Sequence, residues 1–172
     1  MKRALYSVII CLLLPFPASA QQQGFQDRLL DHFAGNWIMK GTIAGEEIIH
    51  DVEADWVLAH NYLRFHELSR EIDKEGFPEY EAIVFIGWNE SSNRYACLWL
   101  DVTGGEGLSA EGIGYAEPNV DKLPFVFDTG SGGVIHTTFS YIRDNDTWKW
   151  TIDIERDGEL KQFARVTLTR KQ

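Results

Sequence analysis

Two histidines lie where their side chains could hold a metal ion or the iron of a haem. His50 falls in phase with Ile48, Val52 and Trp56, so the alternation of this stretch predicts that it faces the same apolar interior. His136 occupies an equivalent place in a later alternating stretch. Imidazole is the commonest metal ligand among side chains, but most interior histidines make only structural hydrogen bonds. An interior hydrogen bond is therefore the simpler interpretation, and the functional interpretation is that both histidines contact a bound molecule, without a metal ion or another cofactor.

Arg165 is the residue best suited to the recognition of an acidic group. It shares one strand face with Phe163 and Thr167, so an inward Phe163 would bring the guanidinium inward as well. There it would orient a ligand carboxylate through a charged hydrogen bond worth roughly 1.5–3 kcal/mol. Burial of about 300 Å² of apolar ligand would contribute roughly 7 kcal/mol. The apolar wall would therefore supply most of the affinity.

Residues for nucleophilic catalysis do not form a recognisable pattern. The sequence contains no Gly-x-Ser-x-Gly motif, and the glycines around Ser131 predict a hairpin turn. Cys97 has apolar neighbours on both sides, which predicts a buried, unreactive thiol. Asp101 and Glu106 remain as an acid and base pair, with a solvated rim as the simpler interpretation. An enzyme is therefore not the favoured class, but an isomerase or hydrolase that uses His50 or Asp101 stays an alternative.

One helix and a long series of strands are predicted around these residues. Apolar residues recur at helical spacing in 25–33, and Gly35 ends that segment as a glycine does after a helix. After Trp37 the apolar period shortens to two, and breaks rich in Gly, Asn and Asp separate the runs. The predicted strands are 36–43, 47–57, 60–72, 80–88, 93–102, 108–116, 122–128, 134–143, 147–155 and 161–170.

The spacing of these strands predicts an all-β, antiparallel fold, because it leaves no room for crossover helices. Closure into an up-and-down barrel of about 8–10 strands removes exposed edges, and a two-sheet sandwich is the alternative. Segments 80–88 and 93–100 are apolar on both faces. Either the helix packs on that side or a homodimer forms there.

The amino-terminal residues predict export. Residues 1–20 have a basic start, a short apolar core and a small-x-small ending at Ala20, which is typical of a cleaved signal peptide. The apolar core of about 11 residues is shorter than the roughly 20 that a membrane-spanning helix needs. We therefore expect a periplasmic or secreted protein whose residues 21–172 form a single domain.

The charge of the chain limits its partners. The net charge is −10, and removal of the two positive charges of Lys2 and Arg3 makes it −12. Such a charge repels phosphate groups, so neither nucleic acid nor an anionic membrane is an expected partner.

Gly35 and Trp37, at the start of the first predicted strand, resemble the opening Gly-x-Trp of lipocalin-like proteins of the calycin superfamily. The segment Trp99-Leu-Asp101, followed by Gly104, Gly105 and Gly112, is similar to a group of exported bacterial lipocalin-like proteins without assigned function. The resemblance implies a calycin-type barrel that the tryptophan closes at one end. It also implies a basic residue of the last strand stacked on that tryptophan, for which Arg165 and Arg170 are the candidates.

The sequence thus favours an exported barrel that binds a small apolar or amphipathic molecule, with a non-binding envelope scaffold as a further alternative. Gly35, Trp37 and Arg170 are expected to have structural roles. The residues predicted to contact the ligand are Met39, His50, Trp56, Phe65, Leu98, Phe125, Phe127, His136, Trp150, Phe163 and Arg165.

Overall fold

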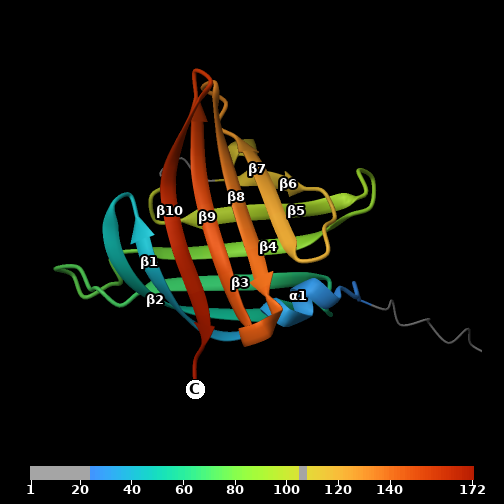
Figure 1. Ribbon diagram of the computed structural model, residues 1–172, viewed down its shortest axis with the longest axis horizontal. Coiled ribbons are helices and arrows are strands. Elements are labelled where there is room, and N and C mark those ends of the chain that lie inside the picture. The colour runs from blue at the N-terminus through green and yellow to red at the C-terminus, as the bar shows by residue number, and fades with distance from the viewer. Residues whose placement is uncertain (1–23, 105–107) are drawn as a thin grey trace, which may run out of the picture.

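Ten antiparallel strands close into a barrel in the computed structural model, which describes residues 24–104 and 108–172 (Figure 1). A short helix, α1 (Arg28–Phe33), precedes them, and two 3-10 turns, η1 (Ala110–Gly112) and η2 (Arg143–Asn145), interrupt the series. The strands are β1 (Gly35–Ile43), β2 (Glu46–Val57), β3 (Tyr62–Ser69), β4 (Glu81–Asn89), β5 (Arg94–Asp101), β6 (Ile113–Ala116), β7 (Lys122–Asp128), β8 (Gly133–Ile142), β9 (Thr147–Arg156) and β10 (Glu159–Arg170).

The predicted fold class, an antiparallel up-and-down barrel with a short N-terminal helix, is confirmed. Each strand pairs with its neighbours in the chain, and β1 closes the barrel against β10 from Trp37↔Arg170 to Ile43↔Ala164. Figure 1 shows β8 to β10 crossing β3 to β5 at a steep angle, as in a flattened barrel. Because the sheet closes on itself, the alternative of a two-sheet sandwich is excluded. The predicted signal peptide, 1–20, and Glu106 lie outside the described residues.

The strand limits lie within three residues of the predicted ranges, as for 60–72 and β3, except in the predicted strand 108–116. The predicted strand 108–116 is wrong in its first half, because η1 occupies Ala110–Gly112 and β6 begins only at Ile113. The helix is also shorter than predicted and begins at Arg28, where the Asp27 side chain accepts a hydrogen bond from the Leu30 amide at 2.9 Å. An aspartate at this capping position satisfies an otherwise unpaired amide of the first turn.

Helix α1 closes one end of the barrel. Its apolar face inserts between the strands, and Phe33 lies 4.3 Å from Trp148 in a stacked arrangement and 5.4 Å from Phe65, ring centre to ring centre. Leu30 and Phe33 are completely buried. The helix therefore covers the barrel end and leaves the apolar outer faces of β4 and β5 without cover from it. Among the described residues, no helix has the length and apolar character needed to cross a membrane.

Gly35, Trp37 and Arg170 form a clamp where the helix meets the barrel. The Arg170 guanidinium lies 3.8 Å above the Trp37 ring and donates hydrogen bonds to the Ala34 carbonyl at 2.7 Å and to the Asp146 carboxylate at 2.9 Å. Gly35 has a φ of +135°, and a Cβ there would collide with this guanidinium. The glycine is therefore required both by its backbone conformation and by the approach of the arginine.

Candidate functional site

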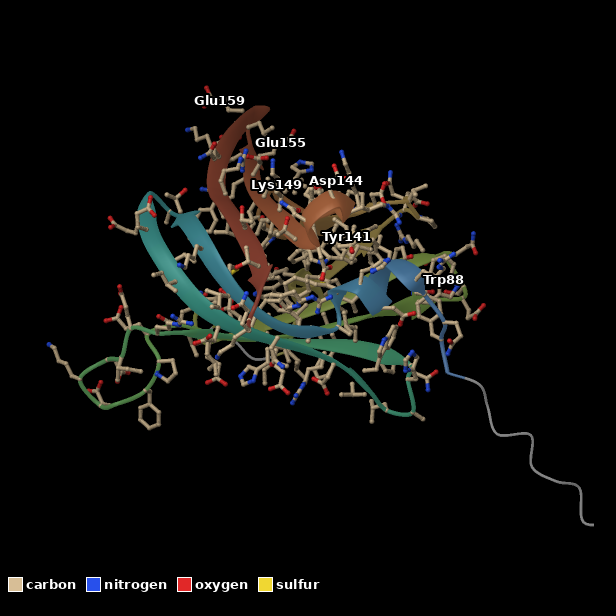
Figure 2. All side chains as sticks on the ribbon, turned by 60° about the horizontal axis from the view of Figure 1, so that its bottom comes forward. Trp88, Tyr141, Asp144, Lys149, Glu155 and Glu159 are labelled. Atoms are coloured by element: carbon tan, nitrogen blue, oxygen red, sulfur yellow. The ribbon has the colours of Figure 1, made fainter. Side chains whose placement is uncertain are left out.

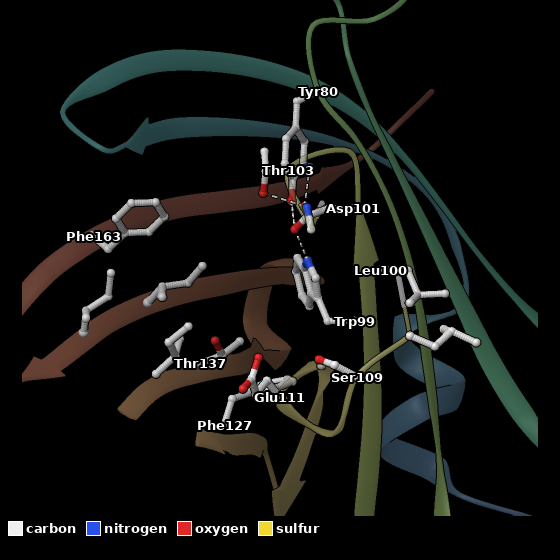
Figure 3. Close-up of a pocket in the computed structure, with 16 residues that line it drawn as sticks. Tyr80, Trp99, Leu100, Asp101, Thr103, Ser109, Glu111, Phe127, Thr137 and Phe163 are labelled. Carbon is white, nitrogen blue, oxygen red and sulfur yellow. Dashed lines mark hydrogen bonds between the residues drawn. The ribbon is translucent and has the colours of Figure 1, made fainter. Parts of the chain in front are cut away.

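A cavity of about 620 Å³ lies at the end of the barrel opposite α1 (Figure 3). One wall is mostly apolar and consists of side chains from β7 to β10, with Thr137 of β8 as its polar member, and the other carries polar groups from β5 and the loops beside it. Glu111 and Ser109, on and before η1, border the mouth. The closed half of the barrel is filled by side chains, so the cavity occupies only the open half.

The apolar wall follows from the alternation of β8 and β9 and from a bulge in β10. Ile135 on β8 and Ile152 and Ile154 on β9 face inward at every second position. The pairing of β10 with β9 shifts between Gln162 and Ala164. The extra residue, Phe163, lines the cavity (Figure 3). A bulge places two residues opposite one and so re-aims the chain.

Asp101 is the centre of the polar wall. Its carboxylate accepts hydrogen bonds from the Trp99 indole at 2.9 Å, the Tyr80 hydroxyl at 3.3 Å and the Gly104 amide at 3.0 Å. The Thr103 hydroxyl and amide donate as well, at 2.6 and 2.7 Å. Burial alone would raise the pKa of Asp101, but these hydrogen bonds outweigh it and hold the pKa below its usual value. Asp101 is therefore a carboxylate at neutral pH.

Tyr80 separates the cavity from a buried ionisable pair. The Nδ1 atom of His50 lies 2.5 Å from the Oε1 atom of Glu67, and the Tyr80 ring stacks on the His50 ring at 5.8 Å. Burial raises the pKa of Glu67, whose second carboxyl oxygen has no partner among the described residues. Burial, with the nearby carboxylates of Glu67 and Asp101, also raises the pKa of Tyr80. Tyr80 is therefore a neutral hydroxyl donor.

Most predicted contact residues lie inside the barrel but away from the cavity. Only Phe127 and Phe163 of the predicted set line it. His50 faces inward as expected but lies behind Tyr80. Trp56 lies near the closed end, where its indole donates to Asp31 at 3.0 Å. The others on the inner face are buried in the packed core, namely Met39, Phe65, Phe125 and Trp150.

The predicted inward orientation of Leu98 is wrong. Leu98 pairs with Phe85 on β4 and Ile113 on β6, and these side chains share the outer face, whereas Cys97 and Trp99 point inward. Alternation could not separate the two faces because both are apolar in this strand. Burial raises the pKa of the Cys97 thiol, in keeping with the predicted inert cysteine.

His136 and Arg165 also lie on the outer face, contrary to the prediction. The Nε2 atom of His136 is 2.8 Å from the Glu155 carboxylate, which Figure 2 shows near the β9–β10 hairpin. The Arg165 guanidinium lies 2.5 Å from the Asp153 carboxylate. The bulge at Phe163 reverses the parity of β10, so Phe163 faces inward and Arg165 outward. Arg170, rather than Arg165, stacks on Trp37.

Most of the residues that line the cavity were not predicted as ligand contacts, and Tyr80, Thr137 and Trp99 are examples. Tyr80 lies between two glutamates and carries no apolar pattern, and Thr137 is a polar residue in the alternation of β8. Trp99 shares its face with Asp101 at a spacing of two, which is the one signal that could have identified it. No group of three or more His, Cys, Asp or Glu side chains suited to a metal ion occurs in the described part of the chain.

Comparisons with protein-family models and with curated proteins gave no match for this chain. The fold and the cavity define the class of the protein, which is an antiparallel β-barrel with one packed end and one hollow end.

Proposed function

We propose that this protein is an exported, lipocalin-like binding protein that holds a small, mostly apolar molecule in the open half of its barrel. The observation that carries the proposal is the cavity of about 620 Å³, with Phe127, Ile135, Ile152 and Phe163 in its wall. Concave apolar sites of this size with a few converging polar groups are the usual form of small-molecule sites. A scaffold with a solidly packed barrel would have no need of this space.

The polar residues favour binding over catalysis. A general base works best with a pKa near the ambient pH, but hydrogen bonds hold the pKa of Asp101 below its usual value. His50 and Glu67 bond to each other and do not line the cavity. Neither the rim carboxylate nor the interior histidine is therefore placed to transfer a proton to a molecule in the cavity.

Titration with a neutral apolar fluorophore, N-phenyl-1-naphthylamine, tests the proposal. We expect saturable binding to the purified protein and a loss of roughly tenfold or more in the Ile135→Trp variant, because a displaced contact area of about 60 Å² is worth about 1.5 kcal/mol. The matched control is Ile49→Trp, which adds the same side chain at a position that is 44% exposed. A folded wild-type protein that binds no such probe, or an Ile135→Trp variant that binds equally well, would exclude the cavity as the site.

Export and self-association are parts of the same proposal. Export rests on residues 1–20 and predicts Gln21 as the amino terminus of the mature protein, which mass spectrometry of the exported fraction would identify. The homodimer rests on the outer face of β3 to β6, where Tyr62 and Ile113 are exposed. Sedimentation that shows only monomer at high concentration would count against it.

A further inference from the structure

We infer that the cavity selects an organic cation, an amine or quaternary ammonium group carrying an apolar tail. This inference rests on the proposed binding function and specifies the ligand class for the same cavity. Two carboxylates, those of Asp101 and Glu111, line the cavity, and no Lys, Arg or His is among its lining residues.

Neither carboxylate has an ion-pair partner among the described residues. Elsewhere on the barrel, Asp51 pairs with Arg70 and Lys171, and Asp146 pairs with Arg170. The five hydrogen-bond donors to Asp101 belong to neutral groups, so they orient the carboxylate without neutralising it. Asp101 therefore keeps a full negative charge at the cavity wall, and that charge attracts a ligand of opposite charge. A cationic ligand would supply the opposite charge.

Basic side chains near the cavity are turned away or already paired. Arg165 is bonded to Asp153 on the outer face. Lys161 lies opposite Ile154 in the β10–β9 ladder, but its side chain is 77% exposed and its Nζ atom lies 3.3 Å from Glu159. The carboxylate of a fatty acid would therefore meet two negative charges in this cavity and no positive one. The predicted role of Arg165 as an anchor for a ligand carboxylate is not supported.

Aromatic rings surround the same carboxylate. Tyr80 and Trp99 donate to Asp101, and Phe127 and Phe163 lie on the facing wall (Figure 3). A cation over an aromatic face is attracted by the ring quadrupole, and recognition of quaternary ammonium groups by aromatic residues uses this attraction. Aromatic rings beside an ionised carboxylate attract a large, weakly hydrated cation more than a neutral molecule.

A buried hydroxyl marks the deeper part of the cavity. Thr137 is only 3% exposed and lines the cavity. Ile135 and Ile152 flank it on β8 and β9. Its hydroxyl is one polar group in an otherwise apolar wall.

Three probes with the same eight-carbon chain separate the contributions of charge and apolar burial: octyltrimethylammonium, octan-1-ol and octanoate. Isothermal titration of the wild-type protein should give the tightest binding for octyltrimethylammonium. We expect roughly a tenfold advantage over octan-1-ol, which corresponds to about 1.4 kcal/mol, and weaker binding of octanoate than of the alcohol. The advantage should decrease as salt is added, because ions screen charges at the mouth.

Variants assign the preference to the two carboxylates. Asp101→Asn and Glu111→Gln should each reduce the affinity for octyltrimethylammonium, by roughly tenfold for Asp101→Asn, with little change for octan-1-ol. Asp144→Asn is the control, because it removes the same charge at the helix end of the barrel (Figure 2). Glu111 is exposed, so Glu111→Gln keeps the test valid if Asp101→Asn disturbs the loop that it caps.

The outcomes distinguish the two proposals. Binding of octan-1-ol that is equal to or tighter than that of octyltrimethylammonium would overturn the cation preference and leave the binding function intact. Octanoate as the best probe would overturn it in the same way. Failure of all three probes to bind a folded protein would contradict the binding function itself.

Discussion

At the scale of single residues, the buried His50–Glu67 pair is the most demanding feature of the interior. Both side chains are nearly or completely buried, and only one carboxyl oxygen of Glu67 has a partner. The transfer of such groups out of water is unfavourable, and their mutual attraction offsets this desolvation cost only while both partners are present. Loss of either member should therefore lower the stability of the protein far more than loss of one member of a surface pair.

His50→Leu should destabilise the protein by about 3–5 kcal/mol, since it leaves a buried carboxyl group alone. The double variant His50→Leu/Glu67→Leu should recover most of that loss, because two apolar side chains leave no unpaired polar group. Urea unfolding followed by tryptophan fluorescence measures each free energy of unfolding.

A surface pair of the same type provides the control. His136→Leu breaks the exposed pair with Glu155 and should cost less than about 1 kcal/mol.

At the buried pair, additive effects of His50→Leu and Glu67→Leu would show that the two side chains do not depend on each other.

The sequence predicts which residues are interior better than it predicts which line the cavity. Phe127 and Phe163 were in the predicted set and do line the cavity, but alternation cannot distinguish the packed half of the barrel, where Phe65 lies, from the hollow half. It also failed for Arg165, because one extra residue in β10 reverses every orientation beyond it. Such a bulge has no reliable signature in a single sequence.

At the scale of elements, the junction of α1 and β1 depends on one glycine. Gly35→Ala should destabilise the protein by more than about 2 kcal/mol, because the residue has a φ of +135° and its new Cβ would displace the Arg170 guanidinium from Trp37. Thermal unfolding of the purified variant measures the loss.

Gly45→Ala separates backbone strain from collision. Gly45 has a φ of +90° in the turn between β1 and β2, and a Cβ there meets nothing within 4 Å. Its substitution should cost only the strain, about 1 kcal/mol or slightly more. If both variants lost the same stability, the contact between Gly35 and Arg170 would contribute nothing beyond the backbone conformation.

The elements themselves were predictable because their signals are local. Trp148 and Trp150 alternate with polar residues in β9, and turn residues mark nearly every break. The exception is the segment before β6: 108–112 was predicted as part of a strand, but Ala110–Gly112 form η1, and Leu108, Ser109 and Glu111 line the cavity. The conformation of such a short segment at the barrel rim is set by its tertiary contacts, which the local sequence pattern does not reveal.

At the scale of the whole molecule, the barrel is unevenly closed. β1 and β2 pair along their length, from Gly35↔Ala54 to Ile43↔Glu46, whereas β6 and β7 are joined at the single pair Tyr115↔Val126. Because fewer hydrogen bonds must break between β6 and β7, the seam between these two strands should open with a lower free energy than the rest of the barrel. It also borders the cavity, through Gly112 beside β6 and Phe127 on β7.

Native-state hydrogen exchange should therefore divide the barrel into a stable and a labile part. We expect amides of β6 to exchange at least about tenfold faster than those of β1 and β2, which is a difference of about 1.4 kcal/mol in opening free energy. Saturation with N-phenyl-1-naphthylamine should slow exchange in β6 and β7 more than in β1. Gly112, next to β6, and Phe127 on β7 line the cavity, no residue of β1 does so, and a ligand stabilises the closed state to which it binds. Uniform exchange around the barrel would contradict the weak seam. Protection confined to β1 and β2 would place the ligand outside the cavity described above.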